Sequence, residues 1–180
     1  MGEAARTAGQ TVGPFFAPAL TFPDDCRLVP RDSPASVTLH GFVYDGEGNG
    51  IPDAVVEVWQ PDSAGNVSRH PGSLRRNADV FTGWGRCATD GDGHYEFTTV
   101  TPGSVAGAQP FFALVIFARG LLNRLFTRAY LPAESDRFLD TLDPARRNTL
   151  ICTPEPSGYR FDIRIQGPGE TVFLEYRGIE

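Results

Sequence analysis

The sequence predicts an all-β fold, a β-sandwich with about seven or eight strands. Its 20 glycines and 15 prolines divide 180 residues into short segments, as expected for strands joined by turns. Several of these segments alternate apolar and polar residues with a period of two or are rich in β-branched residues, and both patterns are typical of strands. A chain of this length is expected to form one domain that buries roughly 70% of its unfolded surface.

The expected strands occupy residues 37–44, 54–59, 85–89, 94–100, 111–117, 123–131, 159–166 and 171–176. Asp90-Gly91-Asp92-Gly93 predicts a hairpin between the third and fourth strands, because Asp-Gly pairs favour tight hairpin turns. Gly167-Pro168-Gly169-Glu170 predicts a second hairpin between the last two strands. Phe111 to Phe117 is nearly all apolar, which predicts a strand buried on both faces.

Helical segments are expected to be few and short. One is expected within Pro132 to Leu142, and another begins at Asp143-Pro144, with Asp as N-cap and Pro in the first helical position. Residues 1–35 lack periodicity and are interpreted as an N-terminal arm that precedes a sandwich domain, residues 36–180. The polar loop from Gln60 to about Thr82 also lacks periodicity, and loops of this length are often functional.

Charge and cysteine content narrow the class of protein. The chain has 16 basic and 22 acidic residues, a net charge of −6, which argues against a protein that binds nucleic acid or anionic membranes. All basic residues are arginine, so lysine-based Schiff-base chemistry is excluded. Three scattered cysteines and an N-terminus without an apolar run predict reduced thiols in a cytoplasmic protein.

Residue chemistry alone does not define a self-contained active site. The three histidines, His40, His70 and His94, do not have the spacing of metal ligands, so partly packed or surface side chains are favoured over a metal site. Strand alternation predicts a solvent-facing position for the carboxylates of Glu57, Glu96 and Asp162.

Two features suggest a functional role. The arm contains Gln10-Thr11-Val12-Gly13-Pro14-Phe15-Phe16, in which a permissive Gly-Pro pair precedes two aromatic residues. Phe117-Ala118-Arg119-Gly120 places a guanidinium at the end of the most apolar strand. Such an arginine either pairs with a carboxylate of its own chain or binds an anionic ligand, because its planar fork suits carboxylates.

Segments spread over most of the chain carry a family pattern. They are Gln10-Thr11-Val12-Gly13-Pro14, Gly41-Phe42-Val43-Tyr44-Asp45-Gly46, Val56-Glu57-Val58-Trp59-Gln60, Gly83-Trp84-Gly85-Arg86, Pro102-Gly103, Phe117-Ala118-Arg119-Gly120, Tyr159-Arg160-Phe161-Asp162-Ile163-Arg164-Ile165-Gln166-Gly167 and Gly169-Glu170-Thr171-Val172-Phe173. In this order and spacing they resemble the intradiol ring-cleaving dioxygenases, whose fold is a β-sandwich. The resemblance is to the alpha chain of a two-chain member of that family.

The departures from the family pattern concern iron. The iron-binding chain of the family holds ferric iron, Fe(3+), with two tyrosines and a His-x-His pair. The first tyrosine position falls on Val67, the second on Ser104 or Val105, and the His-x-His pair on Phe111-Phe112-Ala113. Hydrocarbon side chains and a neutral hydroxyl cannot replace these donors. The resemblance therefore implies that this chain binds no metal and that the iron belongs to a partner beta chain.

What the resemblance implies for this chain is a supporting role in a hetero-oligomer. Thr11, Gly13 and Pro14 match the alpha-chain arm that lines the substrate pocket, and Arg119 matches an arginine near the bound aromatic acid. No catalytic residue is expected in this chain alone. Arg128 is interpreted as a member of a structural ion pair, although a contact with substrate is an alternative.

The implied reaction is the opening of 3,4-dihydroxybenzoate, a small aromatic acid, with O2 to 3-carboxy-cis,cis-muconate. The beta chain supplies the iron, and this chain supplies pocket wall, positive charge and an assembly surface. The alternative is a transthyretin-like sandwich used only for binding or scaffolding. A free-standing dioxygenase for another catechol is disfavoured, because the iron ligands are missing.

Overall fold

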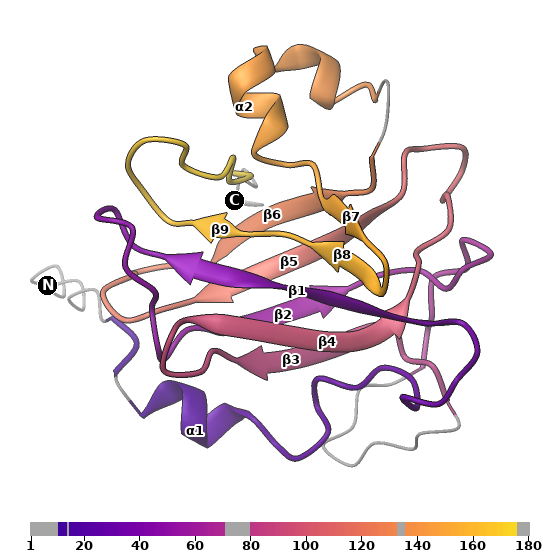
Figure 1. Ribbon diagram of the computed structural model, residues 1–180, viewed down its shortest axis with the longest axis horizontal. Coiled ribbons are helices and arrows are strands. Elements are labelled where there is room, and N and C mark those ends of the chain that lie inside the picture. The colour runs from indigo at the N-terminus through magenta and orange to yellow at the C-terminus, as the bar shows by residue number, and fades with distance from the viewer. Residues whose placement is uncertain (1–10, 14, 71–79, 133–135, 176–180) are drawn as a thin grey trace, which may run out of the picture.

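Two stacked β-sheets form the body of the molecule in a computed structural model that describes residues 11–13, 15–70, 80–132 and 136–175 (Figure 1). One sheet has the order β4-β1-β8-β7, with β9 also paired to β1, and the other has the order β3-β2-β5-β6. The strands are β1 (Ser36–Tyr44), β2 (Val55–Trp59), β3 (Trp84–Ala88), β4 (His94–Val100), β5 (Phe111–Phe117), β6 (Leu125–Tyr130), β7 (Thr153–Glu155), β8 (Gly158–Arg160) and β9 (Ile163–Arg164). The predicted all-β sandwich is confirmed.

The hydrophobic core lies between the two sheets. Alternate residues of each strand point into it, as the period of two requires. Leu39 and Phe97 contribute from the first sheet and Val58, Phe112 and Leu114 from the second, and each is almost completely buried. The remaining alternate residues of β2 and β5 face outward, and these residues lead to the candidate site.

Short helices lie at opposite edges of the sandwich, α1 (Phe16–Leu20) near β3 and α2 (Pro144–Asn148) beyond β6 (Figure 1). The predicted cap of α2 is confirmed, because the Asp143 carboxylate accepts hydrogen bonds from the backbone N–H groups of Ala145 and Arg146 at 3.0 Å. A 3-10 turn, η1 (Leu139–Thr141), lies within the segment expected to be helical. Helix α1 was not expected in the arm.

Two details of the strand prediction are wrong. The Asp90–Gly93 turn forms, with Gly93 N–H donating to Asp90 C=O at 3.0 Å, but β3 and β4 then join different sheets and do not form a hairpin. β5 is not buried on both faces, since Phe111, Ala113 and Phe117 are partly exposed on the outer face of its sheet. One uniformly apolar strand therefore serves both the core and an outer surface.

The expected strand 159–166 is interrupted, and the expected strand 171–176 does not form within the described residues, which end at 175. β8 and β9 both pair with β1 in the same parallel register. Between them the Asp162 carboxylate accepts a hydrogen bond from Phe42 N–H at 3.1 Å, so a side chain takes the place of a ladder bond. Beyond Glu170, Thr171 N–H donates to Arg164 and Leu174 N–H to Phe126; these isolated bonds replace the expected hairpin.

The three cysteines are unpaired thiols, as expected. Burial raises the pKa of Cys87 to about 11 and also raises the pKa of Cys152. In the part of the chain that the structure describes, no helix has both the length and the apolar character required to cross a membrane.

Candidate functional site

The antiparallel pairing of β2 with β5 determines both ends of the candidate site. In this ladder Val55 lies opposite Phe117 and Trp59 lies opposite Ala113. If the same register is extended by two residues at each end, Asp53 lies opposite Arg119 and Pro61 lies opposite Phe111. Pro61 lies eight residues beyond Asp53, so at about 3.3 Å per residue the two ends lie roughly 26 Å apart.

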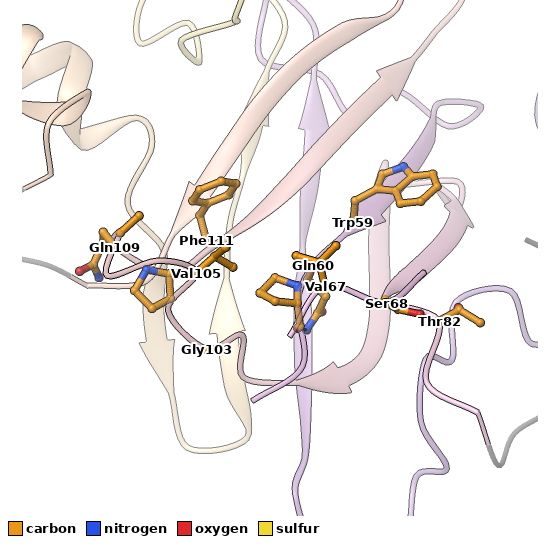
Figure 2. A pocket seen from close by; sticks show the side chains of 13 residues that line it. Trp59, Gln60, Val67, Ser68, Thr82, Gly103, Val105, Gln109 and Phe111 are labelled. Carbon is orange, nitrogen blue, oxygen red and sulfur yellow. Dashed lines mark hydrogen bonds between the residues drawn. The ribbon is translucent and has the colours of Figure 1, made fainter. Parts of the chain in front are cut away.

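At the Phe111 end, loops from both sheets enclose a pocket of about 300 Å³, which we call the apolar pocket. It is lined by Trp59, Gln60, Pro61, Val67, Ser68, Thr82, Gly83, Gly103, Val105, Ala108, Gln109, Pro110 and Phe111. Figure 2 shows Phe111, Val105 and Gln109 on one side of this pocket and Trp59, Val67 and Ser68 on the other. Val67 is 62% exposed, and Trp59 and Val105 are also exposed.

The structure brings three of the positions expected for iron ligands in the family to this one pocket, whereas Ala113, the last residue of the segment matched to the His-x-His pair, is not in its lining. Val67, Val105 and Phe111 line it together. Of Ser104 and Val105, only Val105 lines the pocket, and the Ser104 hydroxyl donates to the Ala108 carbonyl at 2.7 Å. Phe112 points into the core. This agrees with the family pattern, in which the middle residue of the His-x-His segment faces away from the iron.

The polar groups of the apolar pocket are committed to structural bonds. The Gln60 amide nitrogen donates to the carbonyls of Pro61 and Val100, and its oxygen accepts from the Thr99 hydroxyl at 2.6 Å. The described residues that line the pocket include no His, Cys, Asp, Glu or Tyr. Ferric iron requires such donors, so the pocket does not fit this metal.

At the Phe117 end, the described part of the arm lies beside the strand that carries Arg119. Val12 lines a groove of about 810 Å³ together with Phe16, Phe117 and Leu121, and the Phe16 and Phe117 rings lie 5.3 Å apart. Thr11 and Gly13, on either side of Val12, are exposed. Pro14 lies outside the described residues. The predicted arm and the predicted arginine segment are therefore at the same end of the molecule.

Arg119 pairs with a carboxylate of its own chain. Its Nε lies 2.5 Å from Asp53 Oδ2, in agreement with the extended β2–β5 register. The arginine side chain is 54% exposed and the aspartate side chain 17%. Asp53 Oδ1 is buried and has no hydrogen-bond partner among the described residues. The sequence left a structural pair and an anion site open for Arg119, and the structure establishes the pair.

A second arginine–carboxylate pair fixes helix α1 to the sheet. Arg86 Nη2 and Nε donate to one oxygen of Glu57 at 2.6 and 2.9 Å, and Arg86 Nη1 donates to the Leu20 carbonyl at 2.7 Å. The Glu57 side chain is 12% exposed, so its predicted solvent-facing position is wrong. The Glu57–Arg86 cross-strand register was the signal that could have revealed this pair, once the pairing of β2 with β3 was known.

The remaining candidates have local roles. His40 Nε2 lies 2.9 Å from Glu155 Oε2, and His40 Nδ1 lies 3.4 Å from His94 Nε2. His40 therefore lies between two partners. The described residues contain no group of three or more His, Cys, Asp or Glu that could hold a metal.

Within the described residues, no ion pair of Arg128 is present, so the predicted structural ion pair stays a prediction. The Arg128 guanidinium lies over the Phe111 ring at 4.6 Å and donates to the Tyr130 hydroxyl at 3.0 Å. These contacts hold the arginine against the outer face of β5 and β6, beside the apolar pocket.

Glu96 and Asp162 differ from Glu57 in their surroundings. Glu96 is about half exposed and lies 3.6 Å from Arg31. Asp162 pairs with Arg160 at 2.9 Å. Both carboxylates reach solvent, in agreement with the strand pattern.

The two-sheet sandwich, with a pocket formed by loops at one end of the strands, was compared with known protein families and structures. The family model described as Dioxygenase matches residues 12–167. The dioxygenase domain of a dioxygenase–carbohydrate-binding fusion protein from Streptomyces sp. SirexAA-E has the same fold, with a TM-score of 0.58 at 23% identity over 91% of this chain and all of that one. The chain belongs to this dioxygenase family, and its fold is that of intradiol dioxygenases.

Among its relatives the chain is similar to alpha chains of protocatechuate 3,4-dioxygenase. It is 34% identical to the alpha chain from Burkholderia cepacia over 94% of this chain and 97% of that one. It is 38% identical to the alpha chain from Pseudomonas putida over 83% of this chain and 81% of that one. The beta chain from Burkholderia cepacia is 32% identical over 75% of this chain and 66% of that one. The resemblance to an intradiol dioxygenase alpha chain is confirmed.

Proposed function

We propose that this chain is the non-iron alpha subunit of a cytoplasmic protocatechuate 3,4-dioxygenase. In this proposal it associates with an iron-bearing beta chain of related sequence, and the complex cleaves 3,4-dihydroxybenzoate with O2 to give 3-carboxy-cis,cis-muconate. Ferric iron of the beta chain supplies the activation of the catechol ring. The arm, residues 1–35, reaches the partner, and Thr11, Gly13, Pro14 and Arg119 line the substrate pocket at the subunit interface.

The observation that carries the proposal is the contrast between family membership and the apolar pocket. The chain is similar to alpha chains over nearly its full length, yet Val67, Val105 and Phe111 occupy the positions where the family pattern places iron ligands. A chain with this fold and no iron donors in that pocket requires a second chain to perform the reaction. The similarity to a beta chain supports a partner with the same fold.

The charge at the Phe117 end supports a role in binding an anionic substrate. The guanidinium of Arg119 is always protonated and half-exposed, and it lies near the groove formed by the arm. Such a cation raises the local concentration of an aromatic carboxylate and helps to orient it. Among the described residues, none that lines the apolar pocket is charged, and Arg128 beside the pocket is engaged by the Phe111 ring and the Tyr130 hydroxyl. The described part of this pocket is therefore less suited to that anion.

Reconstitution tests the proposal. This chain is expressed alone and together with a related chain that carries two tyrosines and a His-x-His pair. We expect well under one iron per chain in the isolated protein, and a coloured, iron-containing complex that consumes O2 with 3,4-dihydroxybenzoate. Stoichiometric iron in the isolated chain would contradict the proposal. A colourless homo-oligomer that ignores the second chain would favour the scaffolding alternative.

A further inference from the structure

The Arg119–Asp53 pair leaves most of the guanidinium available. The contact uses Nε, which lies at one edge of the planar guanidinium. Within the described residues, no other ion pair or hydrogen bond of Arg119 is present. The two Nη atoms can therefore donate hydrogen bonds to a second carboxylate, because an arginine guanidinium offers five N–H donors.

Asp53 is more firmly held than its partner. Its side chain is 17% exposed, whereas that of Arg119 is 54% exposed. The adjacent Ala54 is buried, and its backbone N–H donates to the Thr89 hydroxyl at 3.0 Å. On the other side, Ala118 is also buried, and Leu121 N–H donates to its carbonyl at 3.2 Å. The carboxylate thus projects from a fixed loop toward a side chain that would otherwise be mobile.

Asp53 also carries an energetic cost that the fold does not explain. Its Oδ1 is buried without a partner among the described residues, and a desolvated carboxylate oxygen without a hydrogen bond destabilises a protein. A neutral residue would hold this loop without that cost. The free-energy cost of burying the Asp53 carboxylate is explained if this carboxylate fixes the orientation of the Arg119 side chain.

The geometry points to Asp53 as a positioning residue that directs the Arg119 guanidinium toward the carboxylate of the aromatic acid substrate. This inference rests on the proposed function of Arg119. An exposed arginine loses rotamer freedom when it binds a ligand. An ion pair that restrains Nε beforehand reduces this loss and keeps the fork in one orientation.

Asp53→Asn tests the inference in the co-purified complex with its iron-bearing partner. The substitution preserves side-chain volume and removes the charge. Measurements at about 0.3 M salt, where the Debye length is about 6 Å, suppress the extra long-range attraction that a less neutralised Arg119 would exert. We expect kcat/KM for 3,4-dihydroxybenzoate to fall about three- to tenfold, mainly through KM, while kcat/KM for catechol, which lacks the carboxylate, changes less than twofold.

Two further variants identify the cause. Asp24→Asn is the matched control, because Asp24 pairs with Arg27 at 2.7 Å on the surface; we expect no change with either substrate. In an Arg119→Ala background, Asp53→Asn should have no additional effect if it acts through Arg119, as a double-mutant cycle would show. An equal loss in that background would overturn the inference.

The remaining outcomes separate this inference from the proposed function. If Arg119→Ala impairs use of the acid but Asp53→Asn does not, Asp53 is not a positioning residue, and the role of Arg119 remains supported. Equal losses for both substrates, with a lower melting temperature, would assign Asp53 a purely structural role. If Arg119→Ala has no effect, both residue roles are wrong, whereas the alpha-subunit assignment still depends on the reconstitution.

Discussion

The two ends of the β2–β5 ladder present different chemistry, although one strand pairing builds both. The Phe111 end carries the apolar pocket, and none of the described residues that line it is charged. The Phe117 end carries Asp53, Arg119 and the arm. A sheet register therefore fixes which residues meet at each end, but the loops that extend the strands decide what each end can bind.

The difference suggests a division of function within one fold. The apolar pocket lies where the family pattern places iron, and its side chains cannot bind iron. The Phe117 end has a cation that can recognise an anionic ligand. In the proposed function, the Phe111 end therefore has no iron chemistry, while the Phe117 end binds substrate at the interface with a partner. The four predictions below test this comparison.

Loss of Arg86 should have the largest effect, and it should act on the Phe117 end. Arg86→Ala removes the partner of Glu57 and the donor to the Leu20 carbonyl, which leaves a carboxylate mostly buried and unpaired. Breaking a buried pair in this way costs about 3–5 kcal/mol. Since about 1 kcal/mol shifts Tm by about 2–4 °C at this chain length, a thermal melt should show a decrease of roughly 10 °C.

The matched control for this variant is Arg27→Ala. Arg27 pairs with Asp24 at the surface, and exposed pairs contribute at most about 1 kcal/mol. Equal melting temperatures for the two variants would show that the Glu57–Arg86 pair does not hold helix α1 in place.

Alkaline pH should weaken the core between the two ends. Burial raises the pKa of Cys87 from 9.0 to about 11, so the folded protein keeps a proton that the unfolded chain releases. The unfolding free energy should therefore be unaffected by Cys87 below pH 9 and fall by about 1.4 kcal/mol per pH unit between about pH 9 and 11. Urea denaturation of the parent and of Cys87→Ala at several pH values measures this.

Only the difference between the two proteins reports on Cys87, because Cys152 and Tyr95 also have raised pKa values from burial. The loss of stability with pH should be smaller for Cys87→Ala by about 2–3 kcal/mol at pH 11. Parallel pH profiles would mean that the thiol of Cys87 is already accessible to solvent in the folded protein.

The sequence predicted most of the fold, and the reasons for the exceptions are physical. Alternation and β-branched runs identified strands β1 to β6, and the Asp143-Pro144 pair identified the start of α2. Strand β7 was missed because three residues, two of them exposed, carry no periodic signal. The break between β8 and β9 depends on the Asp162 side chain bonding Phe42 N–H, which requires knowledge of the neighbouring strand.

The candidate site was predicted in part for a related reason. The family pattern indicated Val67, Val105 and Phe111, and the structure brings them together. The partners Asp53 of Arg119 and Glu57 of Arg86 are distant in the sequence. Both follow from strand registers, which single-sequence periodicity does not provide.

Arg119→Ala should separate substrate recognition from stability. In the complex we expect kcat/KM for 3,4-dihydroxybenzoate to fall tenfold to a hundredfold, since a charge-assisted contact contributes about 1.5–3 kcal/mol. Catechol should lose much less, and Arg119→Lys should recover part of the loss, because a point charge does not reproduce the planar fork. Steady-state kinetics with both substrates measures these effects.

The pair with Asp53 adds a second expectation for this variant. Removal of Arg119 leaves a mostly buried carboxylate without its partner, so a modest decrease in melting temperature should accompany the kinetic loss. Stability alone cannot then decide the role of Arg119. Equal losses of kcat/KM with both substrates would show that Arg119 does not recognise the substrate carboxylate.

The smallest effect on stability is expected for Val67→Ser in the apolar pocket. Val67 is 62% exposed, and surface substitutions of this kind change the unfolding free energy by about 0.5 kcal/mol or less. The isolated chain should nevertheless self-associate through exposed apolar surface near the arm and the Phe111–Phe117 region, and a partner chain should relieve this. Val67→Ser should reduce the self-association, because Val67 adjoins exposed Trp59 and Val105 in one apolar surface.

Leu122→Ser is the matched control from the other end of the ladder. Leu122 is equally exposed, but it borders a groove that also contains Arg124, Glu170 and Glu175, and charged neighbours oppose apolar association. Sedimentation velocity of the isolated variants should therefore show a larger shift toward monomer for Val67→Ser than for Leu122→Ser. The reverse order would show that the isolated chain self-associates through the Phe117 end and not through the apolar pocket.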